Sequence, residues 1–127
     1  MIKEFLEKNS DYLYFVFRVL IGVLFLLHGI QKVTGIYDGK ITLVSLIGLA
    51  AIIETIGGLF IIIGLLTRYT AIITAATMLV AYFKVHASGG LNPLVNKGEA
   101  ALLYFAAFLV IIAFGSRKWS LDNLRKK

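Results

Sequence analysis

A single carboxylate lies in the middle of an apolar stretch of the chain. Between Leu43 and Leu66, Glu54 is the only ionisable side chain, within the sequence AAIIETIGGLF. An ionised group at the centre of a membrane helix costs about 2.5–3.5 kcal/mol on insertion scales, so such groups usually face the interior of a helix assembly and often serve function. A buried carboxylate beside a basic group can hold and transfer a proton. Glu54 is therefore the first candidate for chemistry.

Other polar side chains are predicted to gather on one side of Glu54. A rise of about 1.5 Å per helical residue places most of them between Glu54 and the outer membrane face, and Arg18 nearer the opposite face. We predict that Glu54 and His28 are catalytic as a proton-transferring pair, with Lys32 as the second choice of partner for Glu54. The predicted ligand-binding residues are Arg18, Lys32, His86 and Glu99.

Each of these residues also has a structural explanation that the sequence leaves open. Glu54 could pair with His28 or Lys32 only to fix the register of two helices. Arg18 could extend toward water or hold the fold together, and Lys32 could be an interfacial anchor. Glu99 could belong to the cap of the last helix. Apart from His28 and Lys32, no candidate ligands lie one turn apart on one helix, and lysine rarely binds metals, so no metal site is predicted.

Small and charged residues recur at helical spacing, which predicts two helix faces in contact. Steps of 4, 3, 4 and 3 residues in one segment, and of 3, 4, 3 and 4 in another, place each set on one stripe of a helix. Small residues allow helix backbones to approach closely within a membrane. The two stripes are Arg18, Gly22, Phe25, Gly29 and Lys32, and Glu54, Gly57, Ile61, Gly64 and Arg68.

The composition indicates that these helices lie in lipid. Of the 127 residues, 59% are hydrophobic and 16% are charged, and the mean hydropathy is +0.87. A soluble domain of this length could not bury so much apolar surface. We predict an all-α integral membrane four-helix bundle that forms one domain over residues 1–127. Its spans are expected at residues 12–33, 43–66, 69–87 and 98–115.

The basic residues predict how the bundle is oriented in the cell membrane. Four spans place both termini on one side, and the positive-inside rule assigns the more basic side to the cytoplasm. Both termini are therefore expected to be cytoplasmic, and the first span is expected to be retained rather than cleaved as a signal peptide. The terminal side carries nine basic residues: Lys3, Lys8, Arg18, Arg68, Arg117, Lys118, Arg125, Lys126 and Lys127. The opposite side carries four: Lys32, Lys40, Lys84 and Lys97.

Several classes of function are disfavoured. The chain has no cysteine, which removes disulfides, thiolate metal sites and thiol exchange by the chain itself. Its net charge of +6 comes from residues that flank apolar runs, where lysine and arginine meet lipid headgroups, so no nucleic-acid partner is expected. Neither a nucleotide-binding glycine motif nor a nucleophilic triad is recognisable.

The ordered motifs resemble those of the DoxX family of small four-helix membrane proteins. The matching segments are RVLIGVLFLLHGIQK in the first span, ETIGGLFIIIGLLTR in the second, His86 at the end of the third, and GSRKWSLD after the fourth. The resemblance covers nearly the whole chain, and it departs from the family at Arg117, where a second glycine is common. It implies a membrane subunit associated with thiosulfate:quinone oxidoreduction or with quinone stress, or an assembly factor.

Two functions from different classes are compatible with this resemblance. In the first, a redox-associated membrane subunit binds a quinone or similar small ligand in a polar pocket in the outer half of the bundle, and is at most an accessory subunit of a quinone-linked oxidoreductase. No intrinsic cofactor is expected beyond such a quinone. In the second, a non-catalytic scaffold docks a membrane or peripheral protein partner or forms a homo-oligomer. The lipid bilayer is a partner in both, and small-solute transport would require oligomerisation.

Overall fold

The structure is a computed structural model that describes residues 1–126. Every regular element in this range is helical, which confirms the predicted all-α class. Lys127, one of the basic residues counted for the orientation, lies outside the described residues. The elements are α1 (Ile2–Lys8), α2 (Ser10–Tyr37), α3 (Leu46–Ile63), α4 (Thr67–Ala81), a π-helical turn (Tyr82–His86), a 3-10 turn (Ala87–Gly89), α5 (Glu99–Phe114) and α6 (Leu121–Arg125).

Three helical segments are long and apolar enough to cross a membrane. They are Ser10–Tyr37, Leu46–Ile63 and Thr67–Gly89, whereas α5 is apolar but has only 16 residues. The second predicted span is longer than its helix at both ends. The Ser45 side chain accepts a hydrogen bond from the Gly48 N–H at 3.0 Å and starts α3 there. Gly64 ends α3 because its φ of 70° is left-handed.

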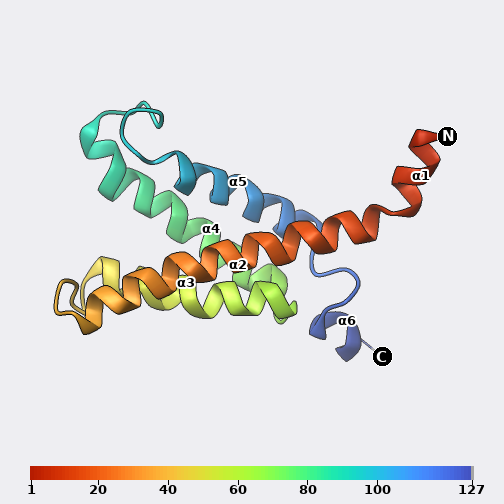
Figure 1. The fold of residues 1–127 in the computed structure, drawn as a ribbon, viewed down its shortest axis with the longest axis horizontal. Helices are drawn as coiled ribbons and strands as arrows, with labels where there is room; N and C mark the ends of the chain where they lie inside the picture. The colour runs from red at the N-terminus through yellow and green to blue at the C-terminus, as the bar shows by residue number, and fades with distance from the viewer. Residues whose placement is uncertain (127) are drawn as a thin grey trace.

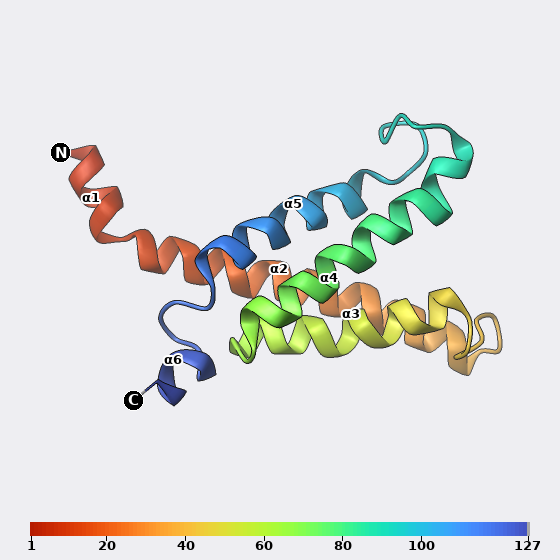
Figure 2. The same cartoon turned by 180° about the vertical axis from the view of Figure 1, so that it is seen from behind.

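The long helices form two antiparallel hairpins (Figure 1). α2 packs along α3 and α4 packs along α5, whereas α2 and α5 make only brief contact. Both ends of the described chain, residues 1 and 126, lie with the turn at residues 64–66 at one end of the molecule, here called the terminal end. The connections at residues 38–45 and 90–98 lie at the opposite end, the loop end. Figures 1 and 2 show that the α4–α5 hairpin diverges from the α2–α3 hairpin toward the loop end.

Glycines bring α2 and α3 close together. A Cβ atom added to Gly22 would lie 2.9 Å from the Ile62 nitrogen, and one added to Gly29 would lie 2.5 Å from the Thr55 nitrogen. The glycine stripe on α2 is therefore a contact face, as predicted. On α3 the assignment differs, because Gly58 meets the α2 backbone. Gly57 instead faces α4, where an added Cβ would lie 2.8 Å from the Thr74 side chain.

An aromatic core joins the two hairpins. Phe25 of α2 and Phe108 of α5 are both fully buried, and their ring centroids are 4.9 Å apart in an edge-to-face arrangement. Such aromatic pairs contribute about 0.5–1.5 kcal/mol beyond the apolar area that they bury. The ring of Tyr104, one turn earlier on α5, lies 5.4 Å from that of Phe25. This core holds α5 against α2 where the two helices touch.

Arg18 of α2 is buried and joins three parts of the chain. Its side chain is 0% exposed, and its guanidinium donates hydrogen bonds to five backbone carbonyls. Two of them belong to the last turn of α3, where carbonyls lack partners within the helix and carry the negative end of its dipole. Arg18 therefore does not extend toward water. The acceptors are Ile61 (3.1 Å) and Ile62 (3.3 Å) in α3, and Ser116 (2.6 Å), Lys118 (3.2 Å) and Trp119 (2.7 Å) after α5.

The segment that Arg18 holds also caps α4. The backbone N–H of Asp122 donates to the Gly64 carbonyl at 2.9 Å. The Asp122 carboxylate accepts hydrogen bonds from the N–H groups of Leu66 at 2.7 Å and Thr67 at 2.8 Å. The residue that precedes α4, Leu66, has no side-chain acceptor, so a residue about 55 positions later supplies one. The C-terminal segment is thus part of the fold at the terminal end.

Arg117, where the chain departs from the family pattern, has a backbone conformation that glycine adopts easily. Arg117 has a φ of 54°, in the left-handed region that glycine adopts most easily, and so does Trp119. The Arg117 guanidinium lies over the Phe114 ring at 4.9 Å and over the Tyr14 ring at 5.5 Å. Cation–π contacts of this kind are each worth about 0.5–1 kcal/mol, which helps to offset the backbone strain.

Replacing Arg18 with Gln should destabilise the terminal end. The variant leaves buried carbonyls without donors, at about 1–3 kcal/mol for each orphaned group, so the free energy of unfolding should fall by about 3 kcal/mol or more. Thermal unfolding in mild detergent measures this loss, and the emission of Trp119, the only tryptophan, reports release of the segment. Lys3→Gln, at an exposed site in α1, is the control. Equal stability of Arg18→Gln and the control would contradict the assigned role.

Asp122 should make folding stability depend on acid pH. Burial by itself raises the pKa of Asp122, but the N–H donors of Thr67 and Leu66 and the charge of Arg125 outweigh it, so the pKa lies below its ordinary value. A carboxyl with a lowered folded-state pKa contributes stability above its unfolded pKa of about 3.9 and loses that contribution as the pH falls through the folded value.

Unfolding temperatures measured between neutral and acid pH test this linkage. Asp122→Asn should be less stable than the parent at neutral pH, and the difference should shrink as the solution becomes acidic. A difference that is constant across the pH range would show that the carboxylate charge is not what caps α4.

Candidate functional site

Glu54 lies at the centre of a polar cluster in the helix assembly. It comes from the middle of α3, and its side chain is 2% exposed. Its Oε1 atom accepts a hydrogen bond from the Lys32 Nζ atom at 2.6 Å, and the Lys32 side chain is 32% exposed. The inward direction predicted for Glu54 is therefore confirmed. Its ion-pair partner is Lys32, the second choice from the sequence, and the first choice, His28, is wrong.

The second oxygen of Glu54 is unsatisfied. Oε2 is buried and has no hydrogen-bond partner among the described residues. Buried polar atoms almost always have a partner, and an acceptor without one loses about 1–3 kcal/mol relative to the same atom in water. The carboxylate is thus held through Oε1 by Lys32, and its Oε2 atom is left without a donor among the described residues.

His28 faces Tyr104 across the contact between α2 and α5. The His28 Nδ1 atom lies 2.9 Å from the Leu24 carbonyl oxygen and 3.2 Å from the Tyr104 hydroxyl. When Nδ1 carries a proton it donates to Leu24, and when it does not it accepts from Tyr104, so the two contacts correspond to different proton positions. His28 is exposed on the protein surface, whereas Tyr104 is buried in the core, so the pair connects the surface with the core.

Tyr104 was not singled out from the sequence. Its hydroxyl lies 3.2 Å from the His28 Nδ1 atom, and its ring packs against the core residue Phe25. The sequence could have indicated Tyr104 as a candidate, because its hydroxyl is a polar group within the apolar run EAALLYFAAFLVIIAF. Tyrosine is nevertheless common in membrane helices, and only the packing of α5 against α2 shows that the ring points at His28. We refer to Glu54, Lys32, His28 and Tyr104 as the Glu54 cluster.

The other predicted site residues lie away from the Glu54 cluster. Arg18 is at the terminal end, where its donors are occupied by carbonyls. His86 is in the π-helical turn that follows α4, with Nδ1 3.3 Å from the Asn96 carbonyl oxygen. Glu99 is exposed and is the first residue of α5. The structure therefore pairs Glu54 with Lys32, with His28 one turn before Lys32 on α2, and it does not place Arg18, His86 or Glu99 with them.

The chemistry available in the Glu54 cluster is proton exchange and hydrogen bonding. It contains a carboxylate, an ammonium, an imidazole and a phenol, each able to donate or accept a proton. Among the described residues, no group of three or more His, Asp or Glu side chains is arranged to hold a metal ion. Pockets of about 500 Å³ and 570 Å³ lie at the terminal end, away from this cluster.

Comparison with known proteins identifies several that are similar to this chain. It is 36% identical over 128 residues to an uncharacterized protein of Haemophilus influenzae, covering 93% of this chain and 94% of that one. It is 32% identical to "Inner membrane protein YqjF" of Escherichia coli, covering 96% and 98% of the two chains. It is 29% identical to "Putative oxidoreductase CatD" of Bacillus subtilis, covering 92% and 90%. No solved structure matches the chain.

The family comparison agrees with these relatives. The family model named DoxX matches residues 13–87, a range that contains His28, Lys32 and Glu54 but not Tyr104. The apolar helices and the inner-membrane relative indicate a membrane protein. The protein therefore belongs to the DoxX family.

Proposed function

We propose that the Glu54 cluster binds the headgroup of a quinone, or a small ligand of similar polarity, and that the protein acts as a membrane subunit of a quinone-linked redox system. The observation that carries this proposal is the buried Oε2 atom of Glu54, an acceptor without a donor among the described residues, next to Lys32. A quinol hydroxyl is a donor of the required kind. The relative named "Putative oxidoreductase CatD" supports the same class of function.

The chemistry of a quinone suits these side chains. Reduction of a quinone to a quinol takes two electrons and two protons, and each carbonyl oxygen must receive a proton. Glu54, when protonated, can donate to one oxygen, and His28 can supply the other with Tyr104 as its hydrogen-bond partner. The electrons would come from a partner protein or a diffusible reductant, so the chain itself is an accessory subunit. That partner, or a second copy of the chain, belongs to the proposal.

Access for such a ligand is favoured between the two hairpins, beside the short contact of α2 with α5. α2 and α5 touch only briefly, and the hairpins that contain them diverge toward the loop end (Figure 2). A flat ring could enter between α2 and α5 without breaking the closely packed α2–α3 contact. His28 is exposed on that side of α2, and Tyr104 faces it from α5.

The proposal includes an orientation. We propose that α5 is the fourth span and that both termini are cytoplasmic, because the basic residues at the terminal end favour that side by the positive-inside rule. The Glu54 cluster then lies in the half of the four-helix bundle toward the outer face, since Lys32 is close to the loop end of α2. A quinone there would exchange protons with the external side of the membrane.

Cysteine labelling in intact cells tests this orientation. The chain has no native cysteine, so a thiol reagent can label the protein only at the single cysteine that is introduced. Ser88→Cys at the loop end should react with a membrane-impermeant thiol reagent, whereas Ile2→Cys should react only after the cells are opened. Labelling of Ile2→Cys alone in intact cells would reverse the proposed orientation.

Replacing Glu54 with Gln should weaken quinone binding. Hydrogen bonds to charged groups contribute about 1.5–3 kcal/mol, so the loss should be about tenfold to a hundredfold in Kd for a short-chain quinone or quinol. Binding to the purified protein in detergent is the measurement, with the unfolding temperature as the check on folding. Glu99→Gln, which changes an exposed glutamate at the start of α5, is the matched control.

The outcome separates the two classes of function. If Glu54→Gln and the parent bind the quinone equally well, the redox proposal is wrong. If the parent instead purifies with a stoichiometric protein and without quinone, the scaffold function replaces it, and the Lys32–Glu54 pair serves only to fix the register of α2 and α3.

A further inference from the structure

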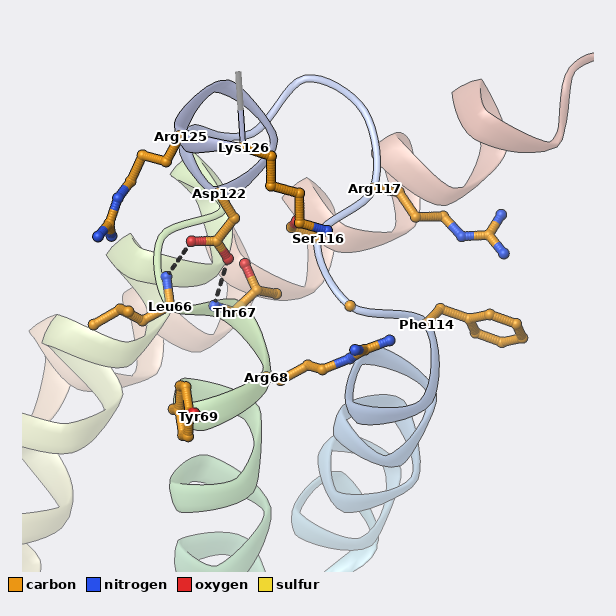
Figure 3. A pocket seen from close by; sticks show the side chains of 11 residues that line it. Leu66, Thr67, Arg68, Tyr69, Phe114, Ser116, Arg117, Asp122, Arg125 and Lys126 are labelled. Atoms are coloured by element: carbon orange, nitrogen blue, oxygen red, sulfur yellow. Dashed lines mark hydrogen bonds between the residues drawn. The ribbon is translucent and has the colours of Figure 1, made fainter.

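A basic pocket lies at the terminal end (Figure 3), and no residue of the Glu54 cluster lines it. It has a volume of about 500 Å³ and is bounded by the start of α4, the end of α5, the segment after α5, and α6. Four basic side chains line it, against one acidic side chain, Asp122. The basic residues are Arg68, Arg117, Arg125 and Lys126.

The charges in this pocket do not cancel one another. Asp122 directs both carboxylate oxygens at the N–H groups of Leu66 and Thr67, so it caps α4 rather than pairing with a basic side chain. No ion pair involves Arg68, Arg125 or Lys126 within the described part of the chain. The pocket therefore keeps an excess of positive charge and attracts anions.

One arginine is held in place at the floor of the pocket. Arg68 donates from Nε to the Ile112 carbonyl at 3.1 Å and from Nη2 to the Ala113 carbonyl at 3.3 Å. These carbonyls are in the last turn of α5 and carry only partial negative charge. They therefore orient the guanidinium but leave most of its positive charge uncompensated. In Figure 3, Arg68 and Lys126 enter the pocket from different elements, whereas Arg117 and Arg125 point away from it on opposite sides. Arg117 instead lies over the Phe114 ring and 3.7 Å from Asp11.

Apolar side chains also flank the pocket. Leu66 and Tyr69 lie on one flank and Phe114 on the other (Figure 3), and they are 44%, 72% and 50% exposed. All three lie where α4 and α5 reach the terminal end, at the level expected for the boundary between acyl chains and headgroups. Exposed apolar faces of α4 and α5, including Ile72 and Leu109, continue from there toward the middle of the membrane. A ligand with a negative head and an apolar tail would contact both the basic and the apolar surfaces.

We propose that this pocket binds the phosphate headgroup of an anionic phospholipid from the leaflet at the terminal end. Arg68 and Lys126 would contact the phosphate, and the acyl chains would lie along α4 and α5 past Tyr69 and Phe114. A free phosphate ion could meet the basic side chains but would gain nothing from the apolar side. The combination of the two surfaces therefore favours the lipid.

Lipid binding to the full chain in detergent micelles tests this site. Native mass spectrometry would compare phosphatidylglycerol, which carries a net negative charge, with zwitterionic phosphatidylcholine. The variant Lys126→Gln changes an exposed residue outside the membrane helices and should fold normally. Because it removes a charge-assisted contact to the phosphate, it should bind phosphatidylglycerol about tenfold more weakly.

A charge-matched control separates a site from general attraction. Lys8→Gln removes the same charge from α1 at the terminal end and should change binding by no more than about twofold. Equal losses in Lys126→Gln and Lys8→Gln would overturn the proposal, as would equal binding of phosphatidylglycerol and phosphatidylcholine.

Two further measurements distinguish a lipid from free phosphate. Tyr69→Ser should weaken phosphatidylglycerol binding because it removes part of the apolar side, and inorganic phosphate should compete poorly with the lipid. If inorganic phosphate displaces the lipid at comparable concentrations and Tyr69→Ser has no effect, the pocket recognises a free anion and the lipid assignment is wrong.

Discussion

The buried guanidinium of Arg18 is the constraint on which the rest of the terminal end depends. A charge inside a membrane protein is tolerated only if other groups stabilise it, and here peptide carbonyls do so from α3 and from the segment after α5. That arrangement requires the chain to return across the end of α3 after α5 is complete. The return brings Asp122 to the start of α4, where it supplies the missing cap. A long-range hydrogen-bond network thus replaces local helix-ending signals.

Two polar interactions at different positions along α2 fix the position of α3 relative to α2. Arg18 binds the carbonyl end of α3, and Lys32, four turns further along, binds the Glu54 carboxylate in the middle of α3. Between them, Gly22 and Gly29 let the two backbones approach. This close contact leaves no freedom for α2 to slide along α3. Ligand-dependent movement, if the proposed function is correct, would therefore occur between the hairpins, where α2 and α5 contact each other only briefly.

The sequence predicted which face of a helix is buried better than it predicted which residues of other helices that face contacts. Helical spacing predicted the inward direction of Glu54 and the glycine contact face of α2, because both follow from periodicity on a single helix. It did not predict that Lys32 rather than His28 would pair with Glu54, since that choice depends on the relative heights and rotation of two helices. Tyr104 was missed for the same reason: its partner is on a helix distant in the sequence.

Loops were the hardest part to predict. The Ser-Leu-Asp element near the C-terminus matched the family pattern, but its purpose could not be seen without the turn at Gly64, to which Asp122 binds. Arg117 was recognised as a departure from the pattern, and the structure places it in a left-handed conformation stabilised by aromatic contacts. The role of Asp122 does not follow from local propensity, because it depends on a turn that lies two helices earlier in the chain.

The central claim is that the Glu54 carboxyl group meets a quinone directly. Infrared difference spectroscopy, recorded on adding a quinone to the membrane-embedded protein, observes the carboxyl stretching bands of buried acids without relying on affinity. We predict a change in a carboxyl band in the parent protein that is missing in Glu54→Gln. If the parent shows no carboxyl change, or if the same change persists in Glu54→Gln, the quinone does not bind at Glu54 and the central claim is contradicted.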